Sequence, residues 1–117
     1  MHTVLIVDDS KTSRSILRNI LTEHGYEVVA KAVNGQEGFD KFCEFNPDIV
    51  TLDITMPVMD GIETLVKIKE YDPSAKVIMV TAAGQKGKML EAIKLGASEF
   101  VTKPFETNQI INIIESL

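Results

Sequence analysis

The sequence predicts an α/β fold, with one parallel sheet of five strands and helices on both of its faces. Short apolar segments alternate with longer segments whose apolar residues recur at helical spacing, and five such strand–helix pairs follow one another within 117 residues. Strict alternation of this kind is typical of parallel strands joined by right-handed helical crossovers. The segments at 3–7, 49–52 and 77–80 are almost continuously apolar, as expected of strands that are covered on both faces.

Turn and capping residues set the expected boundaries of these elements. The expected order is a strand at 3–7, a helix between 10 and 25, a strand at 27–31, a helix from 34 to 46, a strand at 48–52, a helix from 60 to 72, a strand at 76–80, a helix ending at 96, a strand at 98–101 and a helix through 110–117. Ser10, Asn34 and Asp60 are residue types preferred at helix N-caps. Gly25 and Gly96 suit the turn that follows a helix C-terminus.

The polarity of the strands predicts their order in the sheet. The second and fifth strands are shorter and more polar than the other three, which is expected of edge strands. The first, third and fourth strands then form the centre. The resulting order is 2-1-3-4-5, one of the common orders of doubly wound sheets.

Size and charge restrict the class of protein. A chain of 117 residues is long enough for one domain, so we expect residues 1–117 to form a single domain and a monomer. The chain has 12 basic and 17 acidic residues, a net charge of −5, which disfavours direct nucleic-acid binding and anionic membrane surfaces. With one cysteine and no apolar stretch near the roughly 20 residues of a membrane span, we expect a cytoplasmic protein without membrane insertion.

Polar residues of a particular kind follow four of the apolar segments. In chain order these are Asp8 and Asp9, then Asp53, then Thr81, and then Lys103 followed by Pro104. The carboxyl ends of parallel strands meet at one edge of the sheet, where open α/β sheets place their binding sites. The sequence therefore predicts a pocket with three carboxylates, a hydroxyl and an ammonium group.

The composition of this pocket suits a magnesium ion and a phosphoryl group. Three neighbouring carboxylates repel one another unless a cation lies between them, and Mg²⁺ binds carboxylates together with water and phosphate oxygens. Each polar residue taken alone has an ordinary structural explanation, such as a helix cap or a turn, and only their joint occurrence is specific. A cis peptide bond between Lys103 and Pro104, which proline makes possible, would direct the lysine into the pocket.

Four motifs carry a resemblance that extends over the whole chain. They are VLIVDDS at 4–10, DIVTLDITMPVMDG at 48–61, VIMVTAAG at 77–84 and EFVTKPF at 99–105. In these motifs the chain resembles the receiver domain of two-component response regulators, particularly the stand-alone CheY-like chemotaxis regulators. The resemblance implies the flavodoxin-like fold of that family.

The resemblance also implies roles for the pocket residues. Asp53 would accept the phosphoryl group, Asp9 would ligate Mg²⁺ directly, and Asp8 would orient a metal-bound water. The backbone carbonyl of Thr55 would be a further metal ligand. The phosphoryl oxygens would be bound by Thr81 and Lys103.

The resemblance also implies roles for three positions in the switch and in the lifetime of the phosphoryl group. Phe100 stands where the family has its switch aromatic, often a tyrosine, and it lacks the hydroxyl of that residue. Thr55 and Ala83 occupy two variable positions that, in the family, tune dephosphorylation. Thr55 is able to orient a water and Ala83 is not, so the sequence does not rank the lifetime of the phosphoryl group.

The implied function is a phosphorylation-controlled binding module that modifies only itself and is not an enzyme with an external substrate. The phosphodonor would be a histidine kinase, and the target a protein such as a component of the flagellar motor switch. Three alternatives stay open: a receiver module of another pathway, for example within a transcription regulator, an Mg²⁺-dependent phosphatase with an aspartate nucleophile, and a receiver-like scaffold. Against the phosphatase, Thr55 stands where dehalogenase-like enzymes carry a second aspartate.

Overall fold

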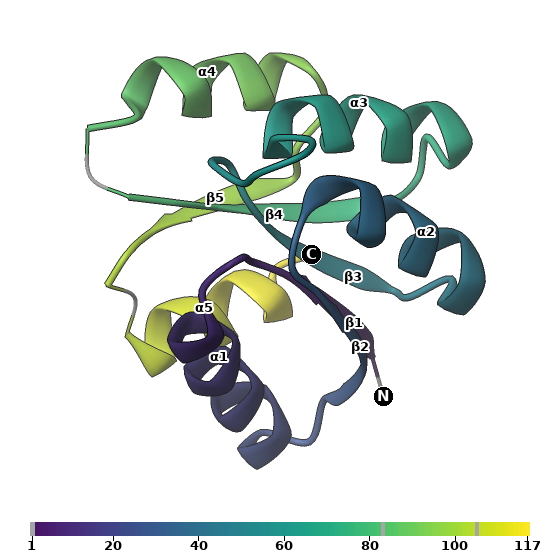
Figure 1. The fold of residues 1–117 in the computed structure, drawn as a ribbon. Coiled ribbons are helices and arrows are strands. Elements are labelled where there is room, and N and C mark those ends of the chain that lie inside the picture. Colours follow the sequence, from purple (N-terminus) through teal and green to yellow (C-terminus); the bar gives the residue numbers. More distant parts are fainter. Residues whose placement is uncertain (1, 83, 105) are drawn as a thin grey trace.

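The structure is a computed structural model that describes residues 2–82, 84–104 and 106–117. Its elements are β1 (Thr3–Val7), α1 (Lys11–Glu23), β2 (Glu27–Ala32), α2 (Gly35–Phe45), β3 (Ile49–Asp53), α3 (Gly61–Tyr71), β4 (Lys76–Thr81), α4 (Lys86–Lys94), β5 (Glu99–Thr102) and α5 (Thr107–Glu115) (Figure 1). The five strands form one sheet in the order β2-β1-β3-β4-β5, and every neighbouring pair is parallel. The predicted fold class, strand order and edge strands are confirmed.

Helices cover both faces of the sheet. Figure 1 shows α2, α3 and α4 on one face and α1 and α5 on the other. Two hydrophobic clusters fill the corresponding layers. Leu65 of α3 packs with Leu52 of β3 in the first cluster, and Leu21 of α1 and Ile110 of α5 pack in the second. The sheet is thus covered on both faces, which leaves the ends of its strands accessible for a binding site.

The predicted helix starts are confirmed by their capping hydrogen bonds. The side chains of Ser10, Asn34 and Asp60 accept from the backbone N–H of the residue three positions further on, at 3.2, 2.8 and 2.9 Å. Because each of these caps follows a strand directly or after a short loop, it also determines where the chain turns back over the sheet. Gly25 and Gly96 adopt positive φ angles of 85° and 105° after α1 and α4, as expected for helix ends.

Four strands differ by one residue from the predicted ranges. The second and fourth strands each run one residue further, to Ala32 and Thr81, and the third and fifth strands are each shifted by one residue. The third strand runs from Ile49 to Asp53 because the carboxylate of Asp48 accepts from the backbone N–H of Thr3 at 2.8 Å instead of extending the strand. The fifth strand runs to Thr102, which pairs with Thr81 of β4. The shift of the third strand includes Asp53 in the hydrogen-bonded sheet. The shift of the fifth strand extends the sheet to the residue directly before Lys103.

The helix predicted before Gly96 is present as α4, but it is less buried than the other helices. Leu90 and Ile93 are 57% and 41% exposed, and Ala92 is the buried residue of this helix. Part of its apolar stripe therefore lies on the surface. Within the described residues, no helix is long and apolar enough to cross a membrane.

Candidate functional site

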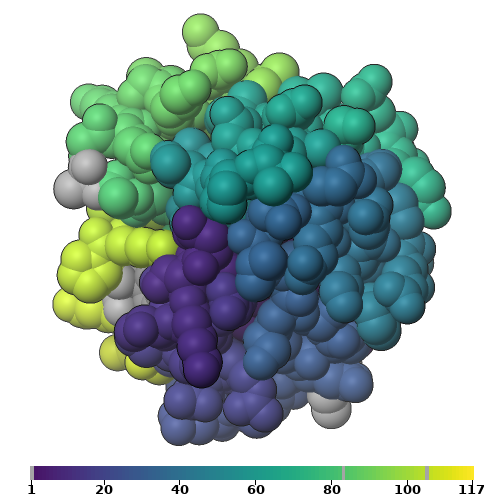
Figure 2. All heavy atoms as spheres, in the orientation of Figure 1, coloured from purple at the N-terminus to yellow at the C-terminus, as the bar shows by residue number. Residues whose placement is uncertain are grey.

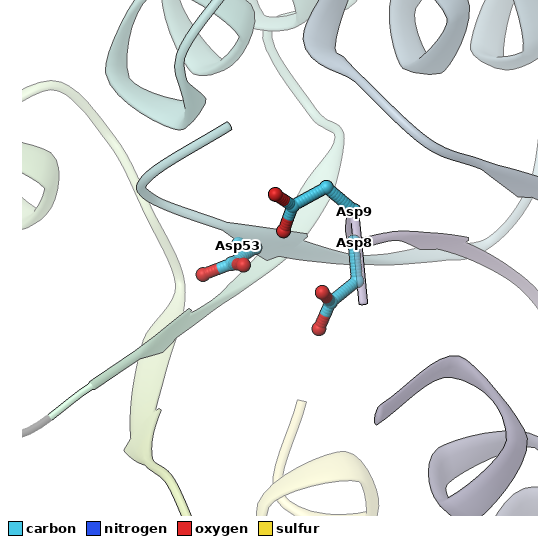
Figure 3. Close-up of side chains that lie close together, drawn as sticks. All are labelled: Asp8, Asp9 and Asp53. Carbon is cyan, nitrogen blue, oxygen red and sulfur yellow. The ribbon is translucent and has the colours of Figure 1, made fainter. Parts of the chain in front are cut away.

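The three acids predicted to converge lie together at the carboxyl end of the sheet. Val7 of β1 pairs with Leu52 of β3, so Asp8 and Asp53, the next residues along each chain segment, are neighbours. One oxygen from each of Asp8, Asp9 and Asp53 lies within 4.8 Å of the others. Figure 3 shows the carboxyl groups around one shared space, with Asp8 and Asp9 following β1 and Asp53 on β3. In the space-filling view, atoms of the β1–α1 segment (purple) adjoin those of the β3–α3 segment (teal) (Figure 2).

Backbone contacts hold Asp8 in this position. Its N–H donates to the carbonyl of Ala32 on the neighbouring strand at 3.0 Å, and its carbonyl accepts from the Arg14 guanidinium at 2.8 Å. Its carboxylate accepts from the N–H of Ser10 at 2.8 Å. Asp8 and Asp53 are 4% and 7% exposed, whereas Asp9 faces solvent. The pocket thus has two buried acids at its base and one exposed acid at its mouth.

Lys103, which directly follows β5, contacts the acid cluster. Its Nζ lies 2.8 Å from a carboxylate oxygen of Asp8 and 3.4 Å from one of Asp53. The peptide bond between Lys103 and Pro104 is cis, as the sequence suggested, and the backbone N–H of Lys103 donates to the carbonyl of Thr81 at 2.7 Å. The predicted meeting of the lysine with the acids is confirmed.

The charges in the pocket do not balance. Burial, and next the charge of Asp8, raise the pKa of Asp53 to about 6, although Lys103 opposes the shift. Burial alone would lower the pKa of Lys103, but the hydrogen bond to Asp8 and the charge of Asp53 outweigh it and raise that pKa. Three carboxylates face one ammonium, so a further cation would be bound favourably. An all-oxygen donor set with one side open to water is the kind of site that Mg²⁺ occupies.

Thr81 ends β4 beside this pocket, but its hydroxyl is already engaged. The side chain is fully buried, and its hydroxyl donates to Oε1 of Gln85 at 2.7 Å, with the carbonyl of Ala82 as a second acceptor at 3.1 Å. Nε2 of Gln85 in turn donates to Oγ1 of Thr55. The Thr81 hydroxyl therefore lies at the predicted strand end, but it donates its hydrogen bond to Gln85.

Comparisons with known proteins decide the family. Residues 4–115 match the model of the response regulator receiver domain. The chain belongs to this family. It is 50% identical to a chemotaxis protein CheY of Listeria monocytogenes over 98% of this chain and 97% of the relative, and 46% identical to CheY of Thermotoga maritima over 97% and 95%.

Solved structures agree with this assignment. The receiver domain superposes with a TM-score of 0.94 on a chain in the complex of CheX, CheY, BeF₃ and Mg²⁺ from Borrelia burgdorferi, at 39% identity over 98% of this chain and 87% of that chain. The chain is therefore a CheY-like receiver domain of a two-component response regulator. Family membership does not favour the phosphatase and scaffold alternatives.

Two residues of the receiver site were not predicted from the sequence. Gln85 joins two hydroxyls of the pocket, yet glutamine carries no strong positional signal at the start of a helix. Gly61 begins α3, and a Cβ placed there would overlap the carbonyl oxygen of Asp53. In the sequence, Gly61 is the last residue of the motif at 48–61, which indicates the family but gives no physical reason for a glycine. The close approach of Gly61 to the backbone of Asp53 is that reason.

The remaining predicted residues differ in how far the structure describes them. Phe100 lies on the edge strand β5 and is 37% exposed. Thr55 lies at the surface of the β3–α3 loop, and metal binding by its carbonyl stays a prediction. Ala83, expected to influence dephosphorylation, lies outside the described residues.

Proposed function

We propose that Asp53 accepts a phosphoryl group from a phosphohistidine of a histidine kinase and that this modification switches a partner-binding face of the domain. The observation that carries the proposal is the shared position of Asp8, Asp9 and Asp53, with one oxygen of each inside a 4.8 Å cluster that Lys103 touches. An acid that is buried, crowded and paired with a lysine suits an acceptor whose charge is compensated during reaction.

The acid cluster would hold one Mg²⁺ ion through Asp9, Asp53 and the carbonyl of Thr55, with Asp8 orienting a metal-bound water. When bound, the metal supplies positive charge that offsets the repulsion between the acids and the incoming phosphoryl group. Asp8 is fixed by Ser10 and Arg14 before any ligand arrives, so part of the site is preorganised.

In the transfer, a carboxylate oxygen of Asp53 attacks phosphorus as the phosphorus–nitrogen bond of phosphohistidine breaks. The imidazole nitrogen keeps the electron pair of that bond and takes a proton from solvent. The Lys103 ammonium lies 3.4 Å from Asp53 and would hold a phosphoryl oxygen in the product. The resulting acyl phosphate is later cleaved by water, which returns Asp53 to the carboxylate.

The signal would leave the pocket through Thr81 and Phe100. A phosphoryl oxygen would draw the Thr81 hydroxyl inward and leave space for the Phe100 ring, which is now partly exposed on β5. Two hydrogen bonds to a charged group contribute about 3–6 kcal/mol. Reversal of a population from 1:99 to 99:1 requires about 5.5 kcal/mol, so one modification operates the switch nearly completely at the upper end of this range and only partly at the lower end.

We infer that the output is a protein partner in chemotaxis, bound at the face formed by α4, β5 and α5. Relatives at 45–50% identity carry the name chemotaxis protein CheY, and one similar structure holds CheY together with CheX. Leu90, Ile93 and Phe100 expose apolar surface on this face, as a binding surface requires. Residues 1–117 would act as one cytoplasmic domain, with a component of the motor switch as a candidate target.

The test is incubation with acetyl phosphate and Mg²⁺, followed by mass spectrometry of the intact protein and of its peptides. The phosphoryl group is expected on Asp53, and Asp53→Asn should abolish stable incorporation. Asp60→Asn is the matched control, because Asp60 is an N-cap on the following loop and asparagine caps equally well. Undiminished incorporation of phosphate in the Asp53→Asn variant would contradict the assignment.

A further inference from the structure

Gln85 connects the predicted switch hydroxyl to the loop on the other side of the pocket. Its Oε1 accepts from Thr81 at 2.7 Å, and its Nε2 donates to the hydroxyl of Thr55. Thr81 ends β4 and Thr55 lies in the β3–α3 loop, so one side chain bridges two segments that both adjoin Asp53. The amide satisfies a donor and an acceptor at once, which fixes its orientation.

Gln85 also precedes helix α4 directly, as its N-cap residue. Its backbone carbonyl accepts from the N–H of Met89 at 3.1 Å, which closes the first turn of that helix. As the N-cap residue of α4 it makes no side-chain capping bond to any residue that the structure describes, because its amide is directed toward Thr81 and Thr55. The position of the first turn of α4 is thereby tied to the hydroxyl of Thr81.

A hydroxyl group has one proton to donate. While Thr81 donates to Gln85, it is unable to donate to a phosphoryl oxygen on Asp53. We propose that Gln85 is a latch that holds the resting state of the domain, and that phosphoryl binding must break its bond to Thr81. This inference rests on the proposed function, in which Thr81 binds the phosphoryl group.

The latch has two consequences. In the resting state it opposes phosphoryl binding by the free energy of the Thr81–Gln85 bond. Once that bond is broken, Gln85 remains linked to Thr55 only, so the start of α4 is released from the end of β4. Gln85 is therefore a positioning residue that couples the occupancy of the pocket to α4, whose Leu90 and Ile93 are exposed on the proposed output face.

The experiment measures binding of beryllofluoride, which stands in for the phosphoryl group, in the presence of Mg²⁺. The full chain, Gln85→Ala and Gln85→Leu are titrated and followed by ¹H–¹⁵N NMR. Both variants should bind beryllofluoride roughly two- to tenfold more tightly than the unaltered protein, the range expected for loss of one neutral hydrogen bond. Before any ligand is added, the amide signals of Ala82 and Gly84 should already be displaced toward their beryllofluoride-bound positions.

The second measurement separates a latch from a merely structural contact, because loss of a structural contact would not displace these signals along the path of activation. Gln36→Ala is the matched control: it removes a glutamine side chain on α2 that bonds Asp40 at 3.0 Å, and it should change neither affinity nor these signals. Unchanged affinity in both Gln85 variants, with normal binding by the unaltered protein, would overturn the latch alone. Failure of the unaltered protein to bind beryllofluoride would overturn the proposed function and the latch with it.

Discussion

The carboxyl group of Asp53 is buried beside a second acid, and both circumstances oppose its ionisation. Its pKa rises from 3.8 to about 6, chiefly through burial and then through the charge of Asp8. The folded protein therefore binds this proton more tightly than the unfolded chain does. The resulting contribution to stability is fully present below pH 3.8 and is lost as the pH rises through about 6. At neutral pH without metal, the charge of Asp53 destabilises the fold.

Replacement of that charge should stabilise the metal-free domain. A difference of about two pKa units corresponds to roughly 3 kcal/mol, so Asp53→Asn is expected to raise the free energy of unfolding by about 1–3 kcal/mol at pH 7.5. Urea denaturation in the presence of a chelator measures this change. The gain should disappear near pH 3, where Asp53 is protonated in both states. Equal stability of the two proteins at pH 7.5 would show that the site does not strain the charged carboxylate.

The buried hydroxyl of Thr51 is a second single residue whose replacement should change the stability of the fold. Its hydroxyl is buried in β3 and has no hydrogen-bond partner among the described residues, and its neighbours in the sheet are Ile6 and Ile78. Thr51→Val removes the unsatisfied group at almost constant volume and is expected to raise the free energy of unfolding by about 1 kcal/mol. The comparison is Thr64→Val, which removes a buried hydroxyl that donates to the carbonyl of Asp60 at 2.8 Å. In the same urea titration, the free energy of unfolding of Thr64→Val should fall by about 1 kcal/mol. A fall in both variants would show that the buried Thr51 hydroxyl does not destabilise the fold.

At the scale of elements, the β3–α3 loop is shaped by a close backbone contact. The N–H of Gly61 donates to the carbonyl of Ile54 at 2.6 Å, and a Cβ at this position would overlap the carbonyl oxygen of Asp53. Gly61→Ala must therefore push α3 away from the end of β3. The displaced loop carries Thr55, whose carbonyl is a proposed metal ligand.

We expect Gly61→Ala to weaken Mg²⁺ binding by at least about tenfold, because small displacements of a preorganised site have large effects on its ligands. Isothermal titration with Mg²⁺ measures the change. Gly87→Ala is the control, since among the described residues no atom beyond its chain neighbours and the backbone of its own helix lies within 4 Å of a Cβ at that position of α4. Alanine there should leave the metal affinity unchanged and stabilise the helix by about 0.5–1 kcal/mol. Normal metal affinity in Gly61→Ala would show that the loop adapts.

Features that depend on contacts between residues close in the sequence were predictable, whereas features that depend on tertiary contacts were not. Ser10, Asn34 and Asp60 were recognisable as helix starts because an N-cap bonds an amide only three residues away. The predicted ends of the second, third, fourth and fifth strands were each one residue off, because pairing with neighbouring strands decides them. The bond from Thr81 to Gln85 depends on how the loop before α4 turns, and no local pattern reports that.

At the scale of the whole molecule, the strand order creates the site. β1 pairs with β3 and not only with β2, so Asp8 and Asp53 become neighbours although 45 residues separate them in the sequence. This convergence was predictable because the polarity of the strands indicated their order. The acids are held together by a sheet that is packed on both faces, and their mutual repulsion opposes that packing.

Metal binding should therefore stabilise the entire fold and not the pocket alone. A ligand that binds only the folded state adds about 2.7 kcal/mol at a concentration of 100 times its Kd, so Mg²⁺ should raise the midpoint of thermal unfolding. Asp9→Asn should abolish this rise with little effect on the metal-free protein, because Asp9 is exposed. Asp40→Asn, at an exposed acid of α2, should retain the full rise. Circular dichroism melts with and without Mg²⁺ measure both, and a full Mg²⁺-dependent rise in Asp9→Asn would place the metal elsewhere.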